Sequence, residues 1–157
     1  MEEGVALDRY AHKNPAFAAV VIHAVAKGYS RKQGRGIPIP WAILSIPYLA
    51  SKSVRDQIPK AWNAKLTNLF ENHPQWQAQN AEALRSNVKY FWPALRLGIS
   101  RGILVLQEGR ISASGKLRPS ELDEYREIYD IADKFGRFLG KEPEETIPNL
   151  FNLEVTE

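Results

Sequence analysis

Three closely spaced prolines constrain this chain more than any other feature of its sequence. They interrupt the apolar stretch Ile37–Ala61, IPIPWAILSIPYLASKSVRDQIPKA. Pro38 and Pro40 favour extended backbone at the residues before them, and Pro40 fits the first turn of a helix because the N–H that proline lacks would be unpaired there anyway. We therefore predict an extended lead-in and then a short helix from Trp41.

Pro47 divides the rest of this stretch. A proline inside a helix removes one backbone hydrogen bond, so Ile46 to Ala50 should bend away from the first helix. Ser51 or Ser53 then caps a second short helix, because a serine side chain accepts a hydrogen bond from a first-turn N–H. The stretch is predicted to form a core element with built-in corners.

The remaining helices are predicted from apolar periodicity. Asn14 and Pro15 carry the cap and first-turn signals of a helix that Gly28 is expected to end, which leaves YSRKQGRG, residues 29–36, as a loop. Apolar residues recur at helical spacing in three later segments, 61–71, 74–102 and 120–140.

A change of period predicts the one β-structure. In ILVLQEGRISA, residues 103–113, two β-rich runs flank a tight turn at Gln107–Arg110. The predicted fold class is therefore mostly α with a β-hairpin, a compact helical domain whose order of elements is also compatible with a winged-helix-like arrangement.

Length and composition predict one domain. The chain has 157 residues, 44% of them hydrophobic, which suits a single globular domain over residues 14–157 after a polar lead-in at 1–13. It contains no cysteine, and no apolar run approaches the roughly 20 residues that span a bilayer. The first ten residues lack the apolar core of a signal peptide, so we expect a cytoplasmic protein without membrane contact.

No motif predicts catalysis. The histidines at 12, 23 and 73 form no metal-binding pair, and the glycines fit no phosphate-binding motif. The acidic clusters at 121–133 and 142–145 are interpreted as a helix first turn and solvent-facing charge. We therefore predict no catalytic residue, cofactor or metal site, and a protein that is not an enzyme.

Two kinds of contact residue stand out. Three cations in the predicted loop at 29–36 are candidate contacts for DNA or for an acidic protein partner: Arg31, Lys32 and Arg35. The candidate interface residues are apolar. Trp76 is an aromatic side chain with few apolar neighbours in sequence, and Ile147, Leu150 and Phe151 belong to a tail that is too apolar to remain in solvent.

Four separated stretches together resemble a known family. They are NPAFAAVVIHAVAKGY at 14–29, the proline-rich stretch at 37–61, ALRLGISRGILVLQEGRI at 94–111, and ADKFGRFLGKEPEETIPNLFNLEV at 132–155. Together they resemble the middle component of bacterial three-component ABC defence systems of the Lamassu type. The resemblance covers most of the chain.

The resemblance implies a function that the residues alone do not. It implies a non-catalytic adaptor that links an SMC-like ABC ATPase to an effector such as a nuclease in an anti-phage or anti-plasmid complex, with DNA contacted through the complex. The alternative is a free-standing winged-helix regulator that binds DNA itself, which the hairpin and the basic sequence pI of about 9.2 favour.

Overall fold

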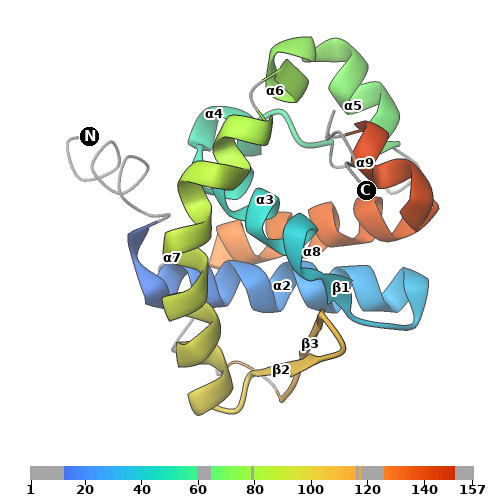
Figure 1. Cartoon of the computed structure of the whole chain (residues 1–157). Helices are drawn as coiled ribbons and strands as arrows, with labels where there is room; N and C mark the ends of the chain where they lie inside the picture. The colour runs from blue at the N-terminus through green and yellow to red at the C-terminus, as the bar shows by residue number, and fades with distance from the viewer. Residues whose placement is uncertain (1–12, 60–64, 79, 116, 118–125, 151–157) are drawn as a thin grey trace.

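A computed structural model describes residues 13–59, 65–78, 80–115, 117 and 126–150 of the chain. Within these ranges the protein is mostly helical, with one small antiparallel sheet (Figure 1). The predicted fold class is confirmed. The first residues of the predicted lead-in and the last residues of the tail, including Phe151, lie outside the described part.

Helix α2, Pro15–Gln33, crosses the middle of the molecule (Figure 1). It contacts the sheet and three other helices: α3 (Ile39–Ala50), α7 (Asn80–Ser100) and α8 (Arg126–Lys141). The Asn14 side chain caps it by accepting hydrogen bonds from the N–H groups of Ala16 (3.0 Å) and Phe17 (3.4 Å). Gly34 ends it with a left-handed φ of 75°. The cap and the first-turn proline were predicted correctly from the sequence.

The predicted end of this helix at Gly28 is wrong. Gly28 is buried inside α2, where a Cβ atom would lie 2.1 Å from the backbone oxygen of Asp133 in α8. The glycine therefore serves close helix packing and does not stop the helix. The expected loop over residues 29–36 shrinks to a short connection after Gln33, and Arg31 and Lys32 belong to the last helical turn.

Helix α8, Arg126–Lys141, lies along α2, and among the described helices these two share the most extensive contact. A Cβ atom on Gly136 would lie 2.2 Å from the carbonyl oxygen of Val25, and one on Gly140 would lie 2.8 Å from that of Tyr29. The two backbones can approach so closely only because these positions have no side chain. The predicted start of this helix at Ser120 lies outside the described residues.

The proline-rich stretch forms β1, Ile37–Pro38, and α3, Ile39–Ala50. The extended backbone is confirmed at Ile37–Pro38, where Pro38 has φ −60° and ψ 143°, but α3 begins at Ile39 and not at the predicted Trp41. Helix α3 runs through Pro47 without interruption, so the proline does not end the first helix. Ile46 and Leu49 on either side are buried against the core, so their packing outweighs the one backbone hydrogen bond that the proline removes.

Ser51 caps the next helix, as predicted. Its hydroxyl accepts a hydrogen bond from the N–H of Val54 at 3.4 Å, and α4 runs over Lys52–Arg55. Three helices follow: α5 over Leu66–Asn72, α6 over Pro74–Ala78 and α7 over Asn80–Ser100. The segment at 74–102 was predicted as one helix, and the structure divides it into α6 and α7.

The predicted hairpin is confirmed. Strand β2, Leu104–Gln107, pairs with β3, Arg110–Ala113, across a two-residue turn in which Glu108 and Gly109 have φ of 54° and 73°. Two positive φ angles are what the common two-residue hairpin turn requires.

The sequence did not predict the third strand. β1 pairs antiparallel with β3, in the order β1-β3-β2, and places Ile37 opposite Ile111. The N–H of Ile39 also donates to the carbonyl of Gly109 at 3.2 Å, which ties the hairpin turn to the start of α3. The turn therefore lies on the helical body and does not project from it as a free wing.

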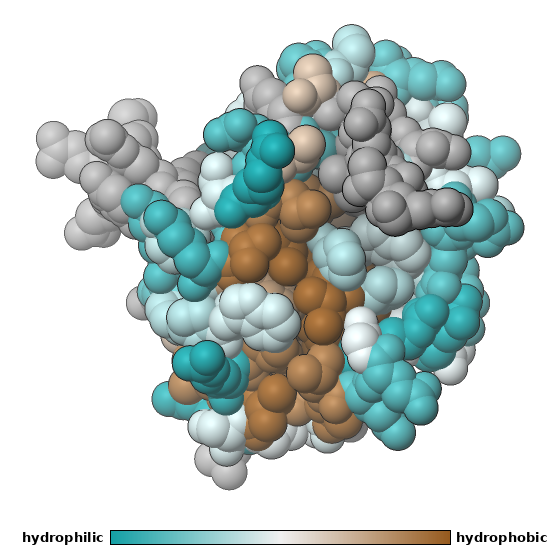
Figure 2. All heavy atoms as spheres, viewed as in Figure 1, coloured by the Kyte–Doolittle hydropathy of each residue, from teal (hydrophilic) through white to brown (hydrophobic). Residues whose placement is uncertain are grey.

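The last described elements are the 3₁₀ turn η3, Glu144–Thr146, and the short helix α9, Ile147–Leu150. The core lies between α2, α3, α8 and the inner face of the sheet, and Phe17, Leu44, Phe135 and Ile111 are all at most 1% exposed. On the face drawn in Figure 2, apolar atoms form a band from α3 down to the hairpin, bordered by hydrophilic atoms. None of the described helices combines the length and apolar character that crossing a membrane requires.

Candidate functional site

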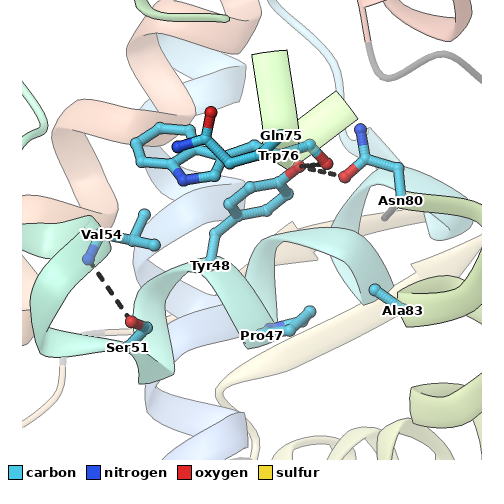
Figure 3. Close-up of a pocket in the computed structure, with 8 residues that line it drawn as sticks. All are labelled: Pro47, Tyr48, Ser51, Val54, Gln75, Trp76, Asn80 and Ala83. Atoms are coloured by element: carbon cyan, nitrogen blue, oxygen red, sulfur yellow. Dashed lines mark hydrogen bonds between the residues drawn. The ribbon is translucent and has the colours of Figure 1, made fainter. Parts of the chain in front are cut away.

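A pocket opens between the end of α3, the cap of α4, and helices α6 and α7 (Figure 3). It has a volume of about 320 Å³. Its lining mixes apolar and polar side chains: Pro47, Tyr48, Ser51, Val54, Gln75, Trp76, Asn80 and Ala83. The pocket thus forms where the proline-rich stretch meets the two helices after it.

Tyr48 forms the floor of this pocket. Its hydroxyl lies within hydrogen-bond distance of the Trp76 carbonyl, at 3.2 Å, and of the Asn80 side-chain oxygen, to which it donates (Figure 3). Burial raises the pKa of Tyr48 above its usual value, so the phenol stays protonated and remains a donor. This buried bond joins α3 to the start of α7 and fixes one wall of the pocket.

Trp76 forms the rim. Its ring stacks on His73 with a centroid distance of 4.2 Å and an interplanar angle of 11°, and it meets Tyr48 edge to face at 5.9 Å. The indole is half-buried. An aromatic side chain held by its neighbours loses little conformational entropy when a partner covers it, which is the property of an interface anchor.

A second polar cluster is centred on Glu144. Arg110 of β3 donates to both carboxylate oxygens, at 2.7 Å and 2.8 Å, while Tyr29 and Arg35 also donate to this carboxylate. The bonds from Arg110 are the main cause that lowers the pKa of Glu144 to about 2. The cluster joins the C-terminal end of α2, the hairpin and η3.

This cluster corrects one interpretation of the sequence. The acidic residues at 142–145 were taken as solvent-facing charge, yet the Glu144 side chain is only 14% exposed and pairs with Arg110. Its partner is 34 residues away in sequence, a separation that no local pattern reveals. Asp133, in the other acidic cluster, pairs with Arg137 at 3.1 Å on the same helix.

The three predicted cationic contacts are not equivalent. Arg31 and Lys32 are exposed on the last turn of α2, and no ion pair joins either one to the described part of the chain. Arg35 pairs with Glu144, although its side chain remains 52% exposed. Arg31 and Lys32 therefore remain the better candidates for contacts with another molecule.

The predicted interface residues also differ in their exposure. Trp76 is accessible at the pocket rim, whereas Ile147 is fully buried and packs in the protein's own core. Leu150 is the last residue of α9. Neither its side chain nor Phe151 belongs to the described part of the structure. Tyr48 and Asn80 shape the pocket but were not predicted from the sequence, because Tyr48 lies within an apolar run and Asn80 within the segment predicted as one helix.

His23 is the buried histidine of α2. It is 2% exposed, and its Nδ1 lies 2.9 Å from the Tyr129 hydroxyl of α8. Burial is the main cause that lowers its pKa, so the ring is neutral near pH 7. No group of three histidine, aspartate or glutamate side chains in the described ranges is arranged to hold a metal ion.

The family of the chain follows from a comparison with protein-family models. The model described as "ABC-three component (ABC-3C) system Middle Component 3" matches residues 8–154. The chain belongs to this family. No curated protein and no solved structure showed a significant match.

The Middle Component 3 assignment confirms the broader part of the resemblance seen in the sequence. The matched range contains every element that lines the pocket and the whole Glu144 cluster. As the middle component of a three-component system, the protein works with other components of that system. The Lamassu type and an SMC-like ATPase partner are finer statements than this match makes.

Proposed function

We propose that this protein is a non-catalytic adaptor in the cytoplasm, which links an SMC-like ABC ATPase to an effector such as a nuclease in a Lamassu-type defence complex. The observation that carries the proposal is the Middle Component 3 match over residues 8–154. A middle component that joins two others needs surfaces for both. The described side chains supply candidate contact surfaces, and the family match supplies the kind of assembly.

The pocket at Trp76 is our candidate for one of these surfaces. It is open, it mixes apolar walls with hydrogen-bonding groups, and it presents a pre-positioned indole. An inserted side chain of a partner could bury its apolar part against Trp76 and Val54 and use the Gln75 amide at the edge (Figure 3). The exposed cations Arg31 and Lys32 offer a separate contact for DNA or for acidic protein surface.

Co-expression with the ATPase and effector subunits encoded beside this chain tests the proposal. The tagged chain should retain the ATPase through affinity purification and gel filtration. Trp76→Ala should weaken retention while the variant stays folded, as judged by circular dichroism. Asn72→Ala, an exposed change at the end of α5 outside the pocket, serves as the matched control.

Two results would contradict the adaptor proposal. One is a folded chain that never retains either neighbouring subunit. The other is tight binding of duplex DNA by the isolated chain, with the steep salt dependence of several phosphate contacts, which would favour the free-standing regulator. The docked hairpin turn, held at Gly109 by Ile39, makes the regulator the weaker candidate because a recognition wing has to project.

A further inference from the structure

One exposed face of α7 combines large apolar side chains with cations. Residues 85, 89, 92, 96 and 99 follow one another at intervals of four and three, so they lie along one side of the helix. We call this set the α7 face: Arg85, Lys89, Trp92, Arg96 and Ile99. All five are exposed, and Trp92 and Ile99 are 39% and 44% exposed.

The chain passes from α7 into the hairpin, which carries further exposed apolar side chains. Ile103 donates its N–H to the carbonyl of Gly98 at 2.9 Å, which turns the chain from α7 directly into β2. On β2, Val105 and Leu106 are 45% and 42% exposed. Among the described residues these two, with Trp92 and Ile99, are the exposed large hydrophobic side chains. All four therefore lie on two consecutive elements, and Trp92 and Ile99 share one face of α7.

The charged residues of the segment from Arg85 to Gln107 are all positive. From Arg85 to Gln107 the sequence contains no aspartate or glutamate, but it contains four cations, Arg85, Lys89, Arg96 and Arg101. The acidic neighbour Glu82 lies 3.8 Å from Arg85, and both side chains are more than three-quarters exposed. Solvent-exposed pairs of this kind neutralise little charge. The α7 face is therefore apolar and positive together.

We propose that the α7 face binds an acidic amphipathic helix of a partner subunit. The spacing of the face, alternating between four and three residues, is the spacing of a helix-pairing seam. From residue 85 to residue 99 it extends about 21 Å at the rise of an α-helix, which equals about four turns of a partner helix. Apolar residues of that helix cover Trp92 and Ile99, and its carboxylates face Lys89 and Arg96.

Charge and apolar surface together favour this occupant over others. A second copy of the chain would place its own cations against Lys89 and Arg96, which repel. Duplex DNA would satisfy the cations, but its phosphates would leave Trp92 and Ile99 without apolar contact. An acidic amphipathic helix satisfies both parts of the surface. This inference rests on the proposed adaptor function and assigns one of its contact surfaces.

The test uses the full chain co-expressed with the neighbouring subunits. Trp92→Ala, Ile99→Ser and the double variant Lys89→Glu, Arg96→Glu should each weaken retention of one partner subunit at least tenfold, while circular dichroism and melting temperature stay close to those of the wild type. Arg126→Glu, on the exposed first turn of α8, is the matched charge control and should bind normally. The charge variant should also reduce the salt dependence of binding.

A photo-crosslinking amino acid in place of Trp92 identifies the occupant. The inference expects crosslinks to an acidic helical segment of a partner subunit. Crosslinks to a second copy of the chain or to DNA would overturn it. If the wild type retains its partners and the α7-face variants bind as tightly, the inference is wrong and the adaptor function stands. If the wild type retains no partner, the adaptor function itself is wrong, and with it this inference.

Discussion

Replacing Gly136 with alanine should break one of the close backbone contacts between α8 and α2. The new Cβ atom would lie 2.2 Å from the carbonyl oxygen of Val25, and that oxygen belongs to the α2 backbone and cannot rotate away. A carbon–oxygen contact needs roughly 3.3 Å, so α8 must move from α2 by roughly 1 Å at this point. Separating packed side chains by that distance loses a quarter to a half of their dispersion energy.

Two opposing contributions determine the expected change in the free energy of unfolding. Overpacking of this kind costs about 3 kcal/mol, near the upper end of its usual range, because backbone has to shift. Alanine recovers about 1 kcal/mol of helix propensity relative to glycine. The net loss should be about 2 kcal/mol in the free energy of unfolding, or a fall of about 4–8 °C in melting temperature for a chain of this length.

Thermal and urea unfolding monitored by circular dichroism measure this loss. Gly98→Ala in α7 is the graded comparison, because the added Cβ there would meet the side chain of Leu104, at 2.3 Å from its Cδ1, which can move by changing rotamer. The loss for Gly98→Ala should be smaller. If Gly136→Ala unfolds at the same temperature as the wild type, or later than Gly98→Ala, the argument from backbone contact is refuted.

Three further predictions concern the Glu144 cluster, the tail and the end of α2. The folded pKa of Glu144, about 2, lies below its unfolded value of 4.5, so its stabilisation is complete above pH 4.5 and lost as the pH falls toward 2, on the order of 3 kcal/mol. Glu144→Gln should be less stable than the wild type at neutral pH and should not lose this stabilisation on acidification. If the urea midpoints of the variant fall with decreasing pH in parallel with those of the wild type, the prediction is wrong. Ile147→Ala should cost about 2–4 kcal/mol because Ile147 is fully buried, and an unchanged urea midpoint would show that the tail does not complete the core. Arg31→Glu combined with Lys32→Glu should lower the free energy of unfolding by only about 1 kcal/mol, since the two side chains are exposed at a helix C-terminus. The double variant should still weaken binding to DNA or to the partner subunits. Normal binding would exclude the two residues as contacts.

The fold class was predictable because most of its signals are local. Asn14 and Pro15 begin α2, Ser51 caps α4, and the turn at Glu108–Gly109 sets the hairpin. Each of these depends on a few neighbouring residues and on backbone geometry that only some residue types accept. The wrong helix end at Gly28 shows the limit of local signals. The sequence does not distinguish a glycine that ends a helix from a glycine that allows a second helix to approach.

The candidate sites were less predictable because they join distant segments. Trp76 was picked out from the sequence, but the pocket also needs Tyr48, 28 residues earlier, whose hydroxyl meets the Trp76 carbonyl. Glu144 was assigned to solvent because its partner Arg110 lies in the hairpin. Such pairs follow from how the elements pack, and one sequence carries no direct record of them.

The sequence by itself determined the local elements, the absence of cysteine, the cationic stretch from Arg85 to Gln107 and the family resemblance. Tertiary structure alone decided that α2 continues to Gln33, that α3 runs through Pro47, and that Ile37–Pro38 adds a third strand. In the first two cases burial against another element overrides the local preference, and in the third the extended segment gains a partner strand far away in the chain. A buried apolar side chain contributes about 1.5–3 kcal/mol, more than most turn or cap signals, and its burial depends on partners far away in the chain.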